Sequence, residues 1–161
     1  MTLKHAKGNL IDMAEQGHFD VIVQGCNCFC TMGSGIAKEI KARYPAAYQV
    51  DCQTEAGARS KLGSYTMAVV DSGDYEFAII NAYTQYSYNR KGETADRFEY
   101  GAFLDVLITL IEACGEMRIG LPYIGMGLAG GDKELILNLI KIFAERVADK
   151  GGSVTLVEYN G

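Results

Sequence analysis

Two glycine-rich segments hold the residues of this sequence that are best suited to bind a ligand. The first runs from Gln24 to Ala37 and has Gly33-Ser34-Gly35 directly before a predicted helix. Glycine lets the backbone approach a ligand closely, and the free N–H groups at a helix start attract phosphate. A tight turn between a strand and a helix explains the same three residues equally well. This segment alone therefore does not establish a binding site.

The second segment, Leu121 to Asp132, contains four glycines between a predicted strand and a predicted helix. Gly125, Gly127 and Gly130 match the pattern G-x-G-x-x-G, which is typical of dinucleotide-binding Rossmann domains. That pattern normally opens the first unit of such a domain, with a second nucleotide-binding half to follow. Here one helix and one strand remain, so a Rossmann-type oxidoreductase is the less favoured interpretation.

The pair of segments is more informative than either one. Each follows a predicted buried strand, and ligands in α/β sheets bind beyond the carboxyl ends of the strands. We therefore expect the loops after Val23 and Ile124 to lie close together. Two glycine-rich loops around one ligand suit a diphosphate with a sugar on either side.

Hydrophobic patterning predicts the elements that position these loops. Short apolar runs rich in β-branched residues predict strands, and apolar residues three or four apart predict helices. The turn Ser72-Gly73-Asp74 predicts a hairpin. Strands are expected at 19–25, 64–71, 75–83, 118–124 and 153–159, and helices at 35–44, 46–56, 95–114 and 132–150. Alternating strands and helices predict a mixed, mostly parallel sheet in a three-layer α/β/α sandwich.

Composition limits the classes of function. The length of 161 residues and the absence of repeats or linkers predict a single domain over 1–161. A net charge of −5 offers no general footprint for nucleic acid, and no apolar run is long enough to span a membrane. Five cysteines and no apolar leader predict a cytoplasmic protein with free thiols.

The cysteines themselves do not predict a metal site or a nucleophile. Cys26, Cys28 and Cys30 alternate along the first segment, but no second ligand pair stands at a suitable spacing for zinc. No histidine lies within the segment to activate a thiol. We expect neither a metal nor a cofactor.

The sequence resembles the macro domain family. The resemblance rests on the segments Val21 to Ala37 and Leu121 to Asp132, and on Lys7-Gly8-Asn9-Leu10, which is similar to the family's early strand-to-loop motif. It implies an α/β/α sandwich that binds ADP-ribose or an ADP-ribosylated protein. The family's early acid accepts a hydrogen bond from the adenine amine, and Asn9 stands at that position. The implied ligand-binding residues are Gly8, Asn9, Leu10, Asn27, Met32, Gly33, Ser34, Gly35, Ile36, Tyr83, Thr84, Gln85, Ile124, Gly125, Met126, Gly127 and Leu128.

The pattern P-x-I-G-x-G-L is similar to the branch with ADP-ribosyl-glutamate hydrolases and ADP-ribose 1″-phosphate phosphatases. The glutamate hydrolases use a lysine and an aspartate where this sequence has Gln85 and Ala129. The resemblance thus implies a hydrolase at the distal ribose that does not form a lysine adduct, with Asn27 and Asp132 as candidate catalytic residues. Asp132 is also a good helix N-cap. A non-catalytic reader of ADP-ribose is the alternative.

Overall fold

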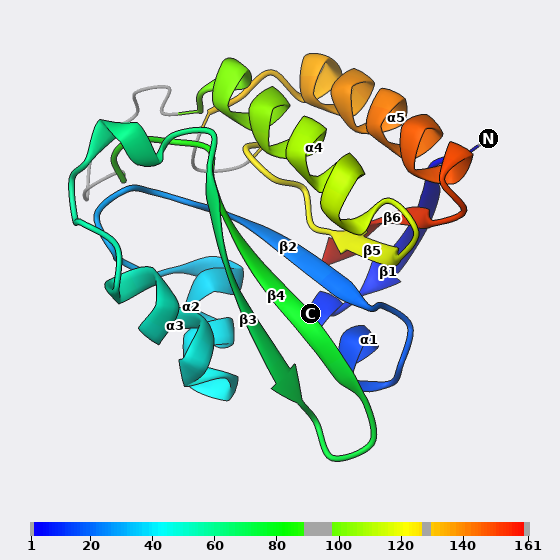
Figure 1. Ribbon diagram of the computed structural model, residues 1–161, viewed down its shortest axis with the longest axis horizontal. Helices are drawn as coiled ribbons and strands as arrows, with labels where there is room; N and C mark the ends of the chain where they lie inside the picture. The colour runs from blue at the N-terminus through cyan, green and yellow to red at the C-terminus, as the bar shows by residue number, and fades with distance from the viewer. Residues whose placement is uncertain (1, 89–97, 127–129, 160–161) are drawn as a thin grey trace.

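The computed structural model describes residues 2–88, 98–126 and 130–159, and its described strands form one six-stranded sheet (Figure 1). The order across the sheet is β1-β6-β5-β2-β4-β3. β3 runs antiparallel to β4, and the other neighbouring pairs are parallel. The strands are β1 (Lys4–Gly8), β2 (Val21–Cys26), β3 (Tyr65–Asp71), β4 (Glu76–Tyr83), β5 (Arg118–Leu121) and β6 (Ser153–Tyr159).

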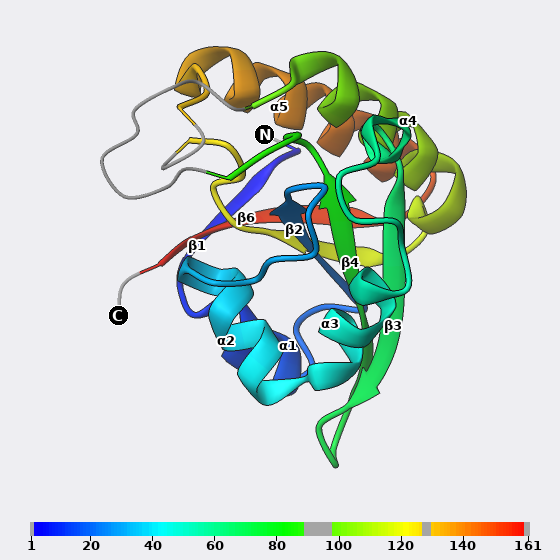
Figure 2. The same cartoon turned by 90° about the vertical axis from the view of Figure 1, so that its left-hand side faces the viewer.

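Helices cover both faces of the sheet. α4 and α5 lie on one face, and α1, α2 and α3 lie on the other (Figures 1 and 2). The helices are α1 (Leu10–Glu15), α2 (Gly35–Arg43), α3 (Pro45–Cys52), α4 (Tyr100–Cys114) and α5 (Lys133–Asp149), with a short 3-10 helix at Arg59–Lys61. The mixed, mostly parallel α/β/α architecture predicted from the sequence is confirmed. Among the described residues, no helix combines the length and apolar character needed to cross a bilayer.

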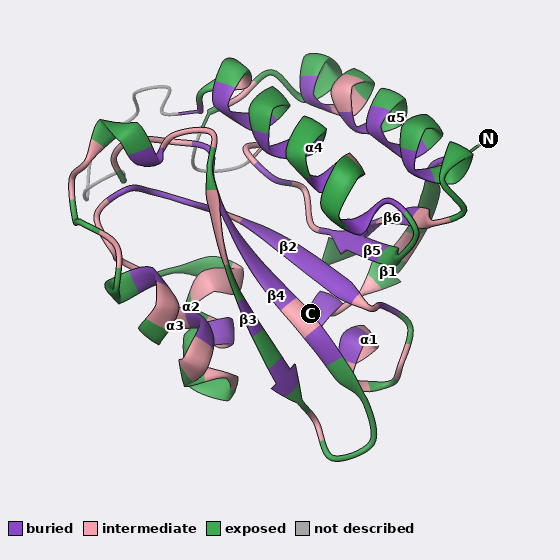
Figure 3. Cartoon of the chain, viewed as in Figure 1, coloured by how far each residue is buried: buried purple, intermediate pink, exposed green. Residues whose placement is uncertain are grey.

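The central strand β2 is buried from both sides, as its run of apolar residues predicts. Val21 and Val23 pack into the core beneath α4 and α5, whereas Ile22 packs into the core above α1, α2 and α3. Figure 3 shows the buried positions along β2 and β4 and along the inner faces of α4 and α5. Two apolar layers therefore hold the ends of β2, β4 and β5 in a rigid frame.

Three element boundaries differ from the sequence prediction by more than two residues, and the first is the end of the helix expected to reach residue 56, which ends at Cys52. The helix expected from residue 95 begins at Tyr100; residues 95–97 lie outside the described part, and Phe98 forms a bridge with Gln85 instead. The strand expected to reach Ile124 ends at Leu121, because Pro122 has no N–H to donate and its carbonyl accepts from the N–H of Ile124 in a turn at 2.8 Å.

Like β1 and the short 3-10 helix, α1 has no counterpart among the elements predicted from the sequence. It has six residues and is stabilised by Asn9, whose Oδ1 accepts hydrogen bonds from the N–H groups of Ile11 and Asp12. A helix of this length shows less than two turns of periodicity, so the hydrophobic pattern carries little signal.

The chain reverses its winding between β2 and β5, which are hydrogen-bonded neighbours. β2 leads into α2 on one face of the sheet, whereas β5 leads into α5 on the opposite face (Figures 1 and 2). The two connecting loops therefore diverge and leave a crevice beyond the strand ends, which is where such folds bind ligands.

Candidate functional site

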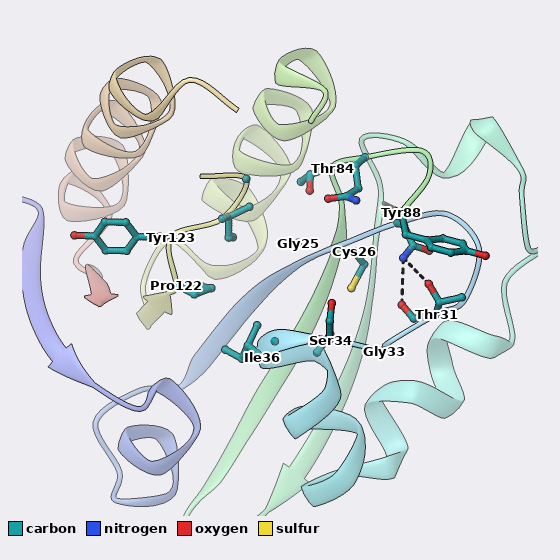
Figure 4. Close-up of a pocket in the computed structure, with 16 residues that line it drawn as sticks. Gly25, Cys26, Thr31, Gly33, Ser34, Ile36, Thr84, Tyr88, Pro122 and Tyr123 are labelled. Atoms are coloured by element: carbon teal, nitrogen blue, oxygen red, sulfur yellow. Dashed lines mark hydrogen bonds between the residues drawn. The ribbon is translucent and has the colours of Figure 1, made fainter. Parts of the chain in front are cut away.

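A first cavity of about 570 Å³ opens at this crevice (Figure 4). Its walls come from the loops that follow β2, β4 and β5 and from the first turn of α2. Tyr88 lies at one end, and Ile36 and Pro122 lie at the other. The lining residues are Gly25, Cys26, Asn27, Thr31, Gly33, Ser34, Gly35, Ile36, Ala37, Thr84, Gln85, Tyr88, Pro122, Tyr123, Ile124 and Gly125.

A second cavity of about 360 Å³ continues from the first. Both cavities are lined by Gly35, Ile36 and Pro122, so the two form one elongated cleft. The second cavity is bordered by the end of β1, the start of α1, one side of α2 and the end of β6. Its other lining residues are Gly8, Asn9, Leu10, Glu39, Val157 and Tyr159.

Asn27 shapes the first glycine-rich loop. Its Nδ2 donates to the hydroxyl of Thr31 at 2.7 Å and to the carbonyl of the same residue at 3.2 Å. Its Oδ1 accepts from the N–H of Phe29 at 2.8 Å. The loop also contains Cys30, a non-glycine residue with a positive φ of 58°. These bonds hold the loop in a conformation that places Asn27 and Thr31 on the cavity wall.

The start of α2 faces the cleft. Ser34 stands at the N-cap position but makes no side-chain bond to the helix, and Figure 4 shows its side chain pointing towards Cys26. Gly35 has a φ of 57°, a conformation that favours glycine. Because the first N–H groups of a helix have no partner within the helix, this end of α2 is suited to an anion.

The second glycine-rich loop closes the opposite side. The N–H of Gly131 donates to the carbonyl of Gly125 at 2.7 Å, which joins the two ends of the loop. Gly125 has a φ of 75° and lies directly against the ring of Phe98. Ile124 and Gly125, two of the predicted ligand-binding residues, line the cavity. The predicted residues Gly127 and Leu128, together with Ala129, lie outside the described residues.

Several predicted site residues face away from the cleft. Tyr83 is buried on the α3 side, where its hydroxyl donates to Asp51 at 2.7 Å. Neighbouring side chains in a strand point to opposite faces, so Tyr83 and Thr84 do not both reach the cavity. Met32 is buried, and its sulfur accepts from Gln24; Met126 packs against the core beneath α4 and α5.

Asp132, a candidate catalytic residue, does not line either cavity. Its carboxylate accepts from the N–H of Leu135 at 3.2 Å and caps α5, and its own N–H donates to the hydroxyl of Tyr100. The structure thus places Asp132 in the capping role that its position before a helix also predicts.

Asn9 lines the second cavity, but its hydrogen bonds differ from those that the family resemblance implies. Its Oδ1 accepts from two N–H groups of α1 at 2.9 and 3.0 Å, so both of its lone pairs are used within the protein. The expectation that this oxygen accepts from an adenine amine is corrected on that ground. Its Nδ2 donates to Glu39, a carboxylate that the sequence analysis did not identify.

The first cavity is uncharged among the residues that the structure describes. None of those lining it is Asp, Glu, His, Lys or Arg. Burial raises the pKa of the Cys26 thiol well above its usual range, and the nearby charge of Asp51 adds to this rise. Cys26 therefore remains a thiol and is a poor nucleophile. Gln85 lines the cavity and donates to the carbonyl of Ser87 at 2.7 Å.

Thr84 has a buried hydroxyl that makes no hydrogen bond to any described residue. Thr84→Val is expected to leave the free energy of unfolding unchanged or to raise it by about 1 kcal/mol, because no bond is lost and a polar group leaves the interior. Urea denaturation measures this change. The matched control is Thr66→Val, because the Thr66 hydroxyl bonds to Asn81 and Tyr83. The free energy of unfolding of Thr66→Val is expected to fall by about 1–2 kcal/mol. A similar loss in both variants would contradict the prediction.

The fold and the cleft together define a class of protein. A helix N-terminus and a glycine-rich loop face each other at the switch point of an α/β sheet, as in domains that bind nucleotide phosphates. The sequence model of the macro domain matches residues 23–140. The chain belongs to the macro domain family. This assignment replaces the Rossmann interpretation of the second glycine-rich loop.

Two proteins are similar to this chain in sequence, and one solved structure is similar to it in fold. A 17.5 kDa protein of Enterobacteria phage T4 is 31% identical over 153 residues, which cover 91% of this chain and 93% of the phage protein. An ADP-ribose 1″-phosphate phosphatase of Aspergillus oryzae is 37% identical over 49 residues, which cover 30% of this chain and 23% of the phosphatase. A Trypanosoma brucei macrodomain in complex with ADP-ribose shares the fold, with a TM-score of 0.70 and 12% identity over 98% of this chain and 63% of that one.

Proposed function

We propose that this chain binds ADP-ribose along the elongated cleft. The observation that carries the proposal is the continuity of the two cavities through Gly35, Ile36 and Pro122. A diphosphate over the start of α2 would place one ribose in each cavity. Both cavity volumes lie in the range of small-molecule sites.

The chemistry of each part of the cleft supports this orientation. The second cavity has apolar walls from Leu10, Ile36 and Val157, with Tyr159 at its rim, and suits adenosine. The first cavity offers amide and hydroxyl groups, including those of Asn27, Thr31 and Gln85, and suits the distal ribose. Backbone N–H groups at α2 and at Gly125 would hold the diphosphate without a lysine or arginine.

Titration calorimetry with free ADP-ribose tests the binding proposal, with NAD titrated alongside. ADP-ribose is expected to bind and to be preferred over NAD. Absence of heat with ADP-ribose, or a preference for NAD, would reject the proposal. The fold of the protein in each titration is verified by its thermal unfolding.

We further propose that the chain hydrolyses ADP-ribose derivatives at the distal ribose. The phosphatase relative supports ADP-ribose 1″-phosphate as the first substrate to test. Water would be added across the ester bond at C1″, giving ADP-ribose and inorganic phosphate. Because the described lining of the first cavity has no acid–base pair, the rate would come from the positioning of water and substrate. ADP-ribosyl-glutamate is the second substrate to test.

The same uncharged lining favours a second candidate function, that of a non-catalytic reader of ADP-ribose. Release of phosphate or of ADP-ribose, measured in single-turnover reactions with the two substrates, distinguishes the candidates. No turnover of either substrate, together with ADP-ribose binding, would reject the hydrolase and retain the reader.

Asn27→Ala separates the two functions within the cleft. In a hydrolase, loss of the Asn27 amide is expected to lower the rate of turnover about 10- to 100-fold and the affinity less, because positioning matters most in the transition state. In a reader, only the affinity can fall. Equal losses of affinity and of turnover would contradict a positioning role for Asn27 in catalysis.

A further inference from the structure

A carboxylate lies at the edge of the mostly apolar second cavity. It belongs to Glu39 on α2. We infer that Glu39 accepts a hydrogen bond from the exocyclic 6-amino group of the base and makes the cleft selective for adenine over 6-oxo purines. This inference rests on the proposed function, since it concerns the adenosine end of the same cleft.

Asn9, a second polar side chain in that cavity, has no acceptor left for a ligand. Its Oδ1 caps α1 through two hydrogen bonds. Its Nδ2 donates to Oε1 of Glu39 at 3.2 Å and lies 3.4 Å from Oε2. Asn9 therefore orients Glu39, and Glu39 is the charged acceptor among the described side chains of the second cavity.

Glu39 is held from its other side by Arg43, one helical turn further along α2. Arg43 Nη2 contacts Oε1 of Glu39 at 3.0 Å, while Nη1 contacts Asp12 at 2.6 Å and Glu15 at 2.9 Å. Among the described residues, Oε1 of Glu39 thus has two close partners, whereas Oε2 has one longer contact, with Asn9. Each carboxylate oxygen offers two lone pairs, so Oε2 retains an acceptor for a ligand.

An ionised carboxylate only accepts hydrogen bonds, and this property gives the discrimination. The 6-amino group of adenine donates and matches it. The 6-oxo group of hypoxanthine would place oxygen lone pairs against the carboxylate, which is repulsive. The side chain of Glu39 is 33% exposed, so water weakens both effects and the expected selectivity is moderate.

The test compares ADP-ribose with inosine diphosphate ribose, in which hypoxanthine replaces adenine. The wild type is expected to prefer ADP-ribose about ten-fold, the effect of one charge-assisted hydrogen bond at a partly exposed site. Glu39→Gln is expected to reduce the preference to less than about three-fold, because an amide can also donate to the 6-oxo group. Glu39→Asp keeps the charge but withdraws the carboxylate by one methylene group, and is expected to lose the preference as well.

Asp12→Asn is the matched control. Asp12 is a partner of Arg43 in the same charge cluster but does not line the cavity. It is expected to retain the ten-fold preference of the wild type. Equal binding of both ligands by the wild type, or an unchanged preference in Glu39→Gln, would overturn the role of Glu39 and leave the proposed function standing. Binding of neither ligand by the wild type would overturn both.

Discussion

Replacing Gly33 with glutamate is expected to weaken ADP-ribose binding about 100-fold or more without unfolding the protein. A Cβ at Gly33 would have no heavy atom within 4 Å, so the fold has room for a side chain there. Gly33 lines the first cavity just before α2, where the diphosphate is proposed to bind. A carboxylate near the phosphates would oppose binding by roughly 3 kcal/mol at a surface-like dielectric constant.

Gly33→Gln is the control for this experiment, because it has the same shape without the charge. It is expected to lose much less affinity than Gly33→Glu. Higher ionic strength is expected to restore part of the loss in Gly33→Glu and to leave Gly33→Gln unchanged. Calorimetry at two salt concentrations measures both effects. Similar losses in the two variants would mean that bulk and not charge blocks the site, which would contradict the placement of the diphosphate.

The second large effect is expected from Gly125→Ala. The new Cβ would overlap the ring of Phe98, which is buried against Tyr100 and Phe103, and the residue would also keep a φ of 75°. We expect the free energy of unfolding to fall by about 3 kcal/mol, through overpacking and backbone strain together. ADP-ribose affinity is expected to fall as well, because the second glycine-rich loop would be displaced.

Gly73→Ala is a matched control that measures the cost of backbone strain without overpacking. Gly73 has a φ of 102° in the turn between β3 and β4, and a Cβ there would meet nothing within 4 Å. The free energy of unfolding of this variant is expected to fall by only about 1 kcal/mol, and its affinity for ADP-ribose is expected to stay unchanged. Urea denaturation of both variants isolates the cost of the contact with Phe98. If Gly125→Ala is no less stable than Gly73→Ala, Phe98 does not set the position of this loop.

From β2 onwards, the order of strands and α-helices could be predicted from the sequence because it depends on local patterns. The apolar run of β2 and the helical spacing of Ile36 and Ile40 each lie within one short segment of the sequence. The glycines of the two loops are equally visible. Their predicted proximity follows from a general rule for parallel sheets, and the shared cavity confirms it.

Side-chain direction at the loops could not be predicted in the same way. Tyr83 and Thr84 are adjacent and both polar, but the alternation of side chains at the end of β4 sends Tyr83 to Asp51 and Thr84, the next residue, to the cavity. Tyr159 reaches the second cavity because β6 pairs with β1 and sets it opposite Gly8, a contact between the two ends of the chain.

The sequence by itself determined the α/β alternation, the two glycine-rich loops and the family, since these reside in short segments whose residues act through their own backbone and periodicity. Only the tertiary structure decided which atoms are free to meet a ligand. Asn9 caps α1 through local hydrogen bonds from Ile11 and Asp12. Glu39 lies beside Asn9 at the cavity only because a hydrogen bond joins these two residues, which are 30 positions apart in the sequence. Such a pairing depends on how the helices pack on the sheet, and no local pattern encodes it.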